Sequence, residues 1–284
     1  MKQIQNILVA TDFSVTSRNA YRYARNLASS LGAALTIIHV KENLIMTSDV
    51  MITSFPPEDG TELIMEIRQL MSEEDAITGK ESSQKEVKIE IITGDPVQVL
   101  TELSQSDNTD LIVIGTTGLA DVLTKIFGST SIKVSNKAHC PVIIVPRDAP
   151  WQPIEQIVFA SNYESMKSEQ VNNITDFATH INADVHFINV KSYDPVLENK
   201  QKETNWEELF GSNHSDLNFE KHTIYGNDTI EQLQKYSEEK GIDLLAFVSM
   251  HRNFWENIMH KSVTENMALS SIIPIMVMHF DDEK

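Results

Sequence analysis

Four apolar runs occur twice, in the same order, in this 284-residue chain. Residues 7–14 read Ile-Leu-Val-Ala-Thr-Asp-Phe-Ser and return at 157–164 as Ile-Val-Phe-Ala-Ser-Asn-Tyr-Glu. The runs at 35–40, 110–114 and 141–145 return at 185–190, 243–247 and 274–278. Such self-similarity indicates a duplicated structural unit. We predict two copies of one domain, residues 1–147 and 154–284, joined by an exposed linker that contains Pro150 and Pro153.

Each copy alternates short apolar runs with segments of helical periodicity. The runs are continuous rather than alternating, which is typical of parallel strands that helices cover on both faces. Ser14 or Thr16 can cap a helix that ends at Gly32, with an apolar stripe of Ala20, Ala24, Leu27, Ala28 and Leu31. We therefore predict an α/β fold of two tandem doubly wound, Rossmann-like parallel sheets with about five strands each.

Residues 43–86 are less regular than the rest of the first copy. They contain Pro56 and Pro57, and seven acidic residues lie between Glu58 and Asp75, against the single basic residue Arg68. The pattern favours an exposed helix with flexible flanks over a dedicated binding segment.

The formal charge of −18 limits the partners of the chain. Nonspecific binding to nucleic acid or to anionic membranes needs a surplus of Lys and Arg, so we expect neither partner. No stretch reaches the roughly 18 apolar residues that span a bilayer, and the N-terminus does not resemble a signal peptide, so we expect a cytoplasmic protein. The single cysteine, Cys140, excludes a disulfide framework and is expected to be a buried small hydrophobe.

Candidate ligand-binding residues follow the strands of the first copy. In an open parallel sheet, ligands bind beyond the carboxyl ends of the strands, where the strand order reverses. An acidic acceptor and a glycine-rich segment that opens a helix together suit a nucleotide, because glycines and helix N-termini bring amide donors close to phosphate. The candidates are Thr11, Asp12, Val40, Gly115, Thr116, Gly118, Gly128, Ser129 and Thr130.

Structural roles remain open for the same residues. Asp12 could serve only as a helix-capping carboxylate. Gly128 and Ser129 could form an ordinary turn and cap, and the isolated pair Gly115 and Gly118 is a weak signal because glycines often end strands.

Three features carry a resemblance to a known family: the strand end at 10–14, the spacing G-x2-G-x9-G-[ST] from Gly115 to Ser129, and the closing segment 139–146. By this resemblance the chain is similar to the universal stress protein family. The resemblance implies a site for ATP, ADP or AMP, with magnesium as the common companion of ATP. It also implies that Asp12 contacts the ribose or adenine and that the backbone of Val40 meets the base. Gly115 and Gly118 would line the ribose and phosphate turn, and Gly128, Ser129 and Thr130 would hold the phosphates.

The resemblance further implies that the fifth strands of two domains pair across a two-fold axis. Here both strands belong to one chain, so the tandem would be a built-in dimer. Whether two such chains form a further homodimer stays open.

The second copy lacks most of the motif. Asn162, Val248, His251 and Lys261 stand where the first copy has Asp12, Gly115, Gly118 and Gly128, and only Ser129 keeps its type, as Ser262. Val248 and His251 add side chains where backbone should approach a ligand, and both disfavour positive φ. We predict that this half binds no nucleotide in the family's usual pose. His251 and His260 lack a metal-binding spacing, so no metal ligand is assigned.

No catalytic residues are assigned either. The chain has no GxxxxGK[ST], no GxGxxG after the first strand, no HExxH and no GxSxG. The predicted site also lacks an evident general base or arginine finger for phosphoryl transfer. We therefore expect an ATP-binding module that acts in stress response or signalling, with an unidentified protein partner and without efficient turnover. The alternatives are a nucleotide-free scaffold protein and a slow ATP hydrolase.

Overall fold

The computed structural model describes residues 4–42, 60–77, 87–116, 129–161, 166–191, 218–248 and 273–278. The first half of the chain holds β1 (Asn6–Thr11), α1 (Val15–Leu31), β2 (Ala34–Lys41), α2 (Thr61–Ile77), β3 (Lys88–Thr93), α3 (Pro96–Leu103), β4 (Leu111–Gly115), α4 (Ser129–Lys137) and β5 (Val142–Val145). The second half holds β6 (Gln156–Ala160), α5 (Ser168–Ile181), β7 (Asp184–Lys191), β8 (Phe219–Tyr225), α7 (Thr229–Lys240), β9 (Leu244–Val248) and β10 (Ile275–Met278).

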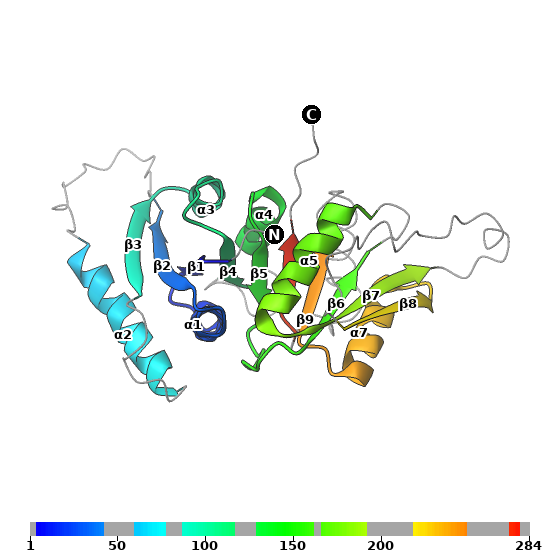
Figure 1. Cartoon of the computed structure of the whole chain (residues 1–284). Helices are drawn as coiled ribbons and strands as arrows, with labels where there is room; N and C mark the ends of the chain where they lie inside the picture. Colours follow the sequence, from blue (N-terminus) through cyan, green and yellow to red (C-terminus); the bar gives the residue numbers. More distant parts are fainter. Residues whose placement is uncertain are drawn as a thin grey trace.

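The described strands form one sheet in the order β3-β2-β1-β4-β5-β10-β9-β6-β7-β8. The order reads the same from either end once each half is numbered separately, and all pairs within a half are parallel. β5 and β10 meet antiparallel at the centre, with Ile144 opposite Ile275. The predicted α/β fold of two doubly wound domains in a pseudo-two-fold pair is confirmed. Because the fifth strands pair within one chain, the two predicted sheets join into one ten-stranded sheet (Figure 1). The division at residues 147 and 154 stays a prediction.

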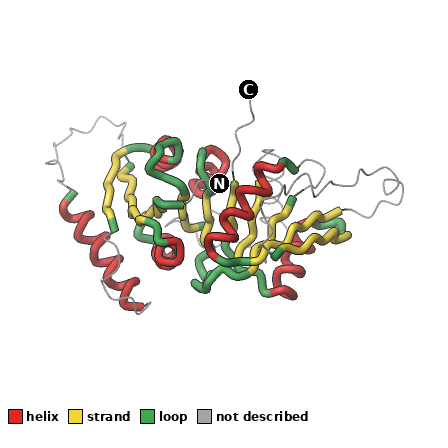
Figure 2. Tube along the Cα trace, in the orientation of Figure 1, coloured by secondary structure: helices red, strands yellow, loops and turns green. Residues whose placement is uncertain are grey.

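Helices cover both faces of the sheet (Figure 2). Buried side chains of α1, α2 and α5 pack on one face, and those of α3, α4 and α7 pack on the other. Both apolar clusters include residues of each half, such as Val145 with Met276 and Ile144 with Ile275. The two halves therefore share a continuous core across the β5–β10 junction. None of the described helices is both long and apolar enough to cross a lipid bilayer.

The first helix begins and ends as its sequence predicts. Ser14 is the N-cap, and its side chain accepts a hydrogen bond from the Ser17 amide at 3.2 Å. Gly32 closes the helix in the left-handed region at φ 64°. The predicted stripe is buried except at its end, where Leu31 is only partly covered.

An acidic residue precedes β4 and its repeat β9 and fastens the start of a neighbouring strand. The Asp110 carboxylate accepts hydrogen bonds from the amides of Gln5 and Asn6, both at 2.9 Å. The Asp243 carboxylate accepts from the amides of Glu155 and Gln156 at 2.8 and 2.9 Å. The duplicated sequence thus repeats this contact.

The acidic run of α2 has a structural role that the sequence analysis missed. Glu73 lies 2.7 Å from Arg18, Glu74 lies 3.2 Å from Arg22, and Asp75 lies 3.6 Å from Arg25, all across the contact with α1. Because Ile67, Leu70 and Glu74 of this helix are buried, the expectation of an exposed helix is wrong for the α1-facing side. Its flanks, 43–59 and 78–86, lie outside the described residues.

The linker between the halves is exposed at most positions but is anchored to α1 at two points. The Asn19 side-chain amide donates to the carbonyls of Pro146 and Ala149, both at 2.8 Å, and Ala149 is buried. The Trp151 ring meets Tyr23 edge-on, with ring centroids 4.9 Å apart.

Candidate functional site

The strand order reverses beside β1 in the first half. β1 lies between β2 and β4, α1 and α2 pack on one face, and α3 and α4 pack on the other. Connections that leave toward opposite faces open a crevice at the carboxyl ends of the strands. Continuing the parallel registers places Asp12 next to Val40 on one side and Thr116 on the other. The fold thus brings these three predicted residues to one edge.

Asp12 is half-buried directly after β1. Its Oδ1 accepts a hydrogen bond from the Ser14 amide at 3.1 Å, so the carboxylate does support the entry into α1. That contact uses one oxygen, and among the described residues Oδ2 has no hydrogen-bond donor. Because Ser14 is the N-cap, Asp12 supports the turn that precedes α1 rather than capping the helix itself, and its other oxygen can accept from a ligand hydroxyl.

Thr11 is placed differently from Asp12. Its side chain is buried, accepts from the Phe13 amide at 3.1 Å and lies 3.2 Å from the Ser17 hydroxyl. The Thr11 hydroxyl thus secures the turn between β1 and α1.

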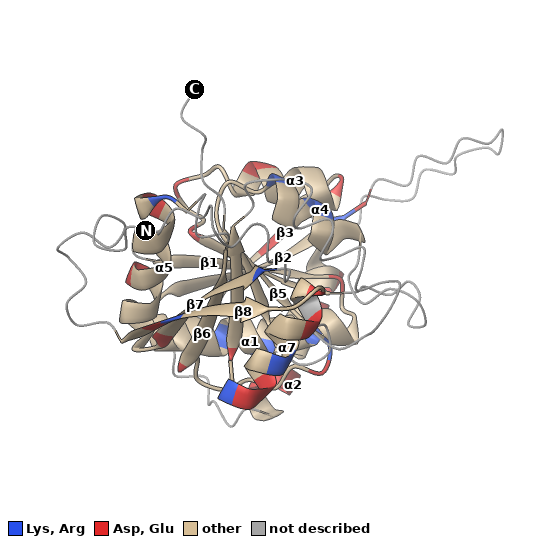
Figure 3. Cartoon of the chain, turned by 90° about the vertical axis from the view of Figure 1, so that its right-hand side faces the viewer, with Lys and Arg blue, Asp and Glu red and all other residues tan. Residues whose placement is uncertain are grey.

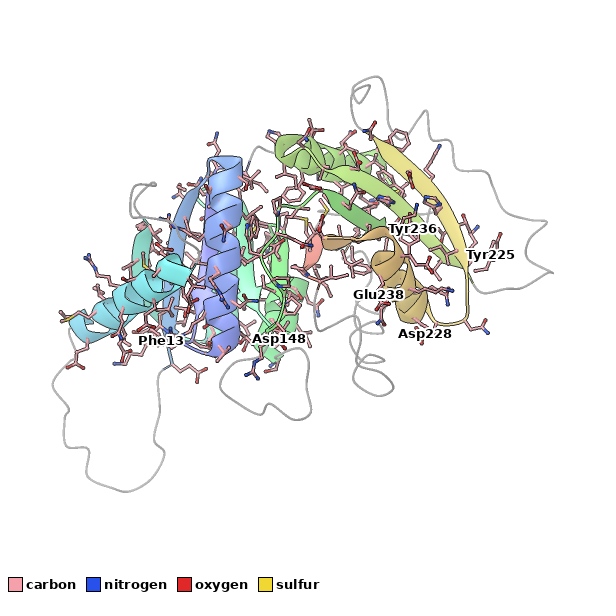
Figure 4. All side chains as sticks on the ribbon, turned by 90° about the horizontal axis from the view of Figure 1, so that it is seen from below. Phe13, Asp148, Tyr225, Asp228, Tyr236 and Glu238 are labelled. Carbon is pink, nitrogen blue, oxygen red and sulfur yellow. The ribbon has the colours of Figure 1, made fainter. Side chains whose placement is uncertain are left out.

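Phe13 and His39 border the same edge and were not among the predicted residues. Phe13 is in the left-handed region at φ 64°, a backbone conformation that is energetically unfavourable for a non-glycine residue. A phenylalanine in the sequence does not predict this conformation. The ring of Phe13 packs on His39, with centroids 4.8 Å apart, and Figure 4 shows Phe13 beside α1. His39 Nδ1 donates to the Thr11 carbonyl at 2.9 Å, so Nε2 is the acceptor nitrogen. The sequence did give one indication of the role of His39, because this polar residue stands near the end of the apolar run at 35–40.

Val40 lies where β2 extends beyond β1. The last pair between these strands joins Thr11 to His39, whereas Val40 and Lys41 pair with β3 alone. The backbone of Val40 therefore borders the edge that Asp12 occupies. The Val40 side chain packs on the apolar cluster beneath α3 and α4, so the backbone is the part suited to meet a planar base.

Gly115 is required by the contact between β4 and α1. A Cβ at this position would lie 2.8 Å from the carbonyl carbon and oxygen of Thr16 and 3.0 Å from the Ser17 nitrogen. Its φ is not positive, so close approach rather than backbone conformation demands glycine. The first turn of α1 thus occupies the space beside Gly115 that the resemblance implied for a ligand.

Thr116 connects this strand to the start of α4. Its amide donates to the Val145 carbonyl at 3.1 Å, and its carbonyl accepts from the Ser131 hydroxyl at 3.0 Å. Ser129 is exposed and Thr130 is half-buried in the first turn of α4, which Ser131 fastens beside β4. The first turn of a helix has amides without intrahelical partners, so this end can donate to an anion. Gly118 and Gly128 lie outside the described residues.

The second half is built differently at the equivalent edge. α1 and α5 end at matching left-handed caps, Gly32 and Asn182, but α1 has 17 residues and α5 has 14. Because the two helices end at equivalent positions, α5 is shorter at its start and lacks the counterpart of the first turn of α1. In α1 that first turn packs on Gly115. Val248 ends β9 at that position and packs on the apolar cluster. A valine there is compatible with a helix that begins one turn later. Asn162, His251, His260, Lys261 and Ser262 lie outside the described residues.

Cys140 is 6% exposed, as expected for a small hydrophobe beside a core strand. Burial raises the pKa of its thiol from 9.0 to about 12, which makes the thiolate about 1,000-fold scarcer.

We expect Cys140 in the folded chain to resist alkylation at pH 8, and to react at the rate of a free thiol after denaturation. Mass spectrometry of iodoacetamide-treated samples measures both rates, and rapid labelling without denaturant would contradict the burial.

The comparisons with known proteins agree with this fold. The family model for the Universal stress protein family matches residues 3–146. Universal stress protein YxiE of Bacillus subtilis is 32% identical over 146 residues, which cover 49% of this chain and 97% of the relative. A universal stress protein of Methanocaldococcus jannaschii is 29% identical over 147 residues, 50% of this chain and 82% of the relative.

Among solved structures, a universal stress protein from Archaeoglobus fulgidus DSM 4304 superposes with a TM-score of 0.66 at 17% identity. The match covers 98% of this chain and 97% of that chain, so the similarity of fold includes both halves. With the family model, the curated relatives and the symmetrical sheet in agreement, the chain belongs to the universal stress protein family.

Proposed function

We propose that the first half binds an adenine nucleotide at the carboxyl edge of β1, β2 and β4, and that the chain acts as a nucleotide-binding module in stress response or signalling without efficient turnover. The observation that carries the proposal is Asp12, which keeps one carboxylate oxygen without a donor among the described residues. A ribose places two hydroxyl donors at such an oxygen. Membership of the universal stress protein family favours the adenine nucleotide.

The rest of the edge supplies complementary groups. Continuing the β1–β2 register places the backbone of Val40 next to Asp12, and the first turn of α4 offers the hydroxyls of Ser129 and Thr130 with its amides. His39 donates from Nδ1 to the Thr11 carbonyl and keeps Nε2 as an acceptor. Acceptors at one end and donors at the other match a ligand with hydroxyl or amino groups at one end and phosphate at the other. ATP, ADP and AMP all have this polarity.

Magnesium fits this edge only as a companion of the phosphates. Mg²⁺ prefers oxygen ligands and keeps several waters. The described residues at the start of α4 supply hydroxyls and no carboxylate. The ion would therefore be held mainly by phosphate oxygens and water, with Ser129 or Thr130 as the protein ligand, and would neutralise phosphate charge.

Asp12→Asn tests the site with little disturbance of the fold. The asparagine oxygen can still accept from the Ser14 amide, but the charged acceptor is lost, as at Asn162 in the second half. Hydrogen bonds to charged groups contribute about 1.5–3 kcal/mol. We therefore expect nucleotide affinity to fall about 10- to 150-fold, measured by calorimetry with ATP, ADP and AMP in the presence of magnesium.

Asn162→Ala is the matched control and should leave both affinity and stoichiometry unchanged. Wild type that binds none of the three nucleotides would refute the proposal and favour the scaffold alternative. Phosphate release from ATP should proceed at the same background rate in wild type and in Asp12→Asn. Release that the substitution abolishes would instead establish hydrolysis at this edge.

A further inference from the structure

Two histidines and a glutamate gather on the second half of the sheet, away from the proposed nucleotide edge. His186 is the third residue of β7, and Glu220 and His222 lie near the start of the neighbouring strand β8. The register places Glu220 opposite His186, and His222 follows two residues later on the same face. The three residues lie toward the amino ends of β7 and β8. The proposed nucleotide site of the first half, in contrast, lies at the carboxyl ends of its strands.

The distances between the ligand atoms suit a small cation. Glu220 Oε2 lies 3.6 Å from His186 Nδ1 and 2.8 Å from His222 Nε2, and the three ligand atoms all lie within 4.8 Å of one another. Tetrahedral ligands about 2.1 Å from zinc are about 3.4 Å apart. Small side-chain adjustments therefore bring the three atoms to coordination distance.

A chain of hydrogen bonds orients His186 with Nδ1 as its acceptor nitrogen. The side-chain amide nitrogen of Gln156 donates to Asp184 Oδ2 at 3.2 Å, and this contact directs the amide oxygen of Gln156 toward His186. His186 Nε2 donates to that oxygen at 2.6 Å. A metal-binding histidine usually donates its other ring N–H to a carbonyl or carboxylate in this way. Because Nε2 carries the proton, the lone pair is on Nδ1, which faces Glu220.

The hydroxyl of Tyr236 marks where that lone pair points. Tyr236 comes from α7 and lies 2.7 Å from Nδ1 of His186, so its hydroxyl donates there (Figure 4). A metal ion would replace this proton donor. His186 is 5% exposed, and burial lowers its pKa, which favours the neutral, ligating form of the ring. The side chains of Glu220 and His222 are 52% and 37% exposed, so an ion can enter from solvent.

The first half provides an internal comparison. The equivalent register positions on β2 and β3 hold Thr36, Lys88 and Glu90, of which the lysine and the glutamate form an ion pair. The histidines thus belong to the second half alone. Lys240, at the end of α7, lies 3.8 Å from Glu220 Oε2 and balances part of the carboxylate charge when no metal is bound. Figure 3 shows that α7 carries both acidic and basic residues.

We propose that His186, Glu220 and His222 bind one divalent first-row transition-metal ion, with a fourth position open to water. Two imidazoles and one carboxylate favour zinc-like ions over magnesium or calcium, which prefer oxygen ligands throughout. The site is independent of the proposed nucleotide site.

Zinc titration of the chelator-treated, nucleotide-free full chain tests the site by calorimetry. We expect one zinc ion per chain at this cluster. Removal of a ligand should weaken this binding at least as much as loss of a supporting hydrogen bond, which costs about 10- to 100-fold in affinity. His222→Ala and Glu220→Gln are the variants of choice, because both side chains are partly exposed and their loss leaves the core intact.

His180→Ala is the matched control, since His180 is exposed on α5 and bonds only to the Asp176 carbonyl of its own helix among the described residues. It should bind zinc as wild type does, and so should Asp12→Asn, which separates this site from the nucleotide site. A second readout is the visible spectrum of the cobalt-loaded chain, which should show strong four-coordinate absorption that His222→Ala abolishes. Wild type that binds no zinc, or zinc affinity unchanged in His222→Ala, would overturn the proposal.

Discussion

Gly115→Ala should destabilise the protein by about 3 kcal/mol, the upper end of the usual cost of overpacking. The new Cβ would lie 2.8 Å from the carbonyl carbon and oxygen of Thr16, both backbone atoms in the first turn of α1. A side chain could turn aside, but a helix backbone must move as a unit. Chemical denaturation followed by circular dichroism measures the loss.

Gly94→Ala is the control for this substitution. Its Cβ would meet only the Cγ2 methyl of Val99, at 2.9 Å, so one side chain has to shift and the backbone of a helix does not. We expect a loss below about 1.5 kcal/mol there. Equal stability of Gly115→Ala and wild type would show that α1 does not need this close approach. The Gly115 variant should also lose nucleotide affinity, because a displaced α1 carries the turn at Asp12 with it.

Ile144→Asp should cost more than about 4 kcal/mol, because it places an unpaired carboxylate in a fully buried site. Ile144 lies at the centre of the sheet, paired with Ile114 of β4 on one side and Ile275 of β10 on the other. The substitution therefore strikes both halves at their junction. Thermal unfolding should shift as a single transition, since the two apolar clusters cross the junction.

Ile144→Val removes one methylene at the same site and should cost only about 0.5–1.5 kcal/mol. If the halves fold independently, Ile144→Asp will instead produce two transitions, with the second half melting at its original temperature. That result would contradict a shared core.

The repeated runs and the helix signals were sufficient for the fold because they depend on local chemistry. Continuous apolar strands need cover on both faces, and Ser14 and Gly32 mark the ends of α1 by their own hydrogen-bonding and conformational preferences. The pairing of the fifth strands across a two-fold axis came from the resemblance, and the sheet shows that pairing as an antiparallel contact of β5 and β10.

The candidate edge was predicted less completely. Asp12, Val40 and Thr116 lie at one edge because the doubly wound strand order places the carboxyl ends of β1, β2 and β4 side by side. Three features of this edge could not be predicted from the sequence, since each depends on contacts between segments. They are the hydrogen-bonded hydroxyl of Thr11, the left-handed backbone of Phe13 and the position of the His39 ring. The same holds for the acidic residues of α2, whose partners are arginines about 50 residues earlier.

The amino-acid sequence alone determined the duplication, the doubly wound α/β class of each half and the loss of the glycine motif in the second half, because these are properties of residue type and spacing. Only the tertiary structure decided why Gly115 must be a glycine: the first turn of α1 occupies the space beside it, whereas α5 begins one turn later beside Val248. It also brought His186 next to Glu220 and His222, 34 and 36 residues away in the chain. Contacts between distant strands follow from register and burial, which no local pattern encodes.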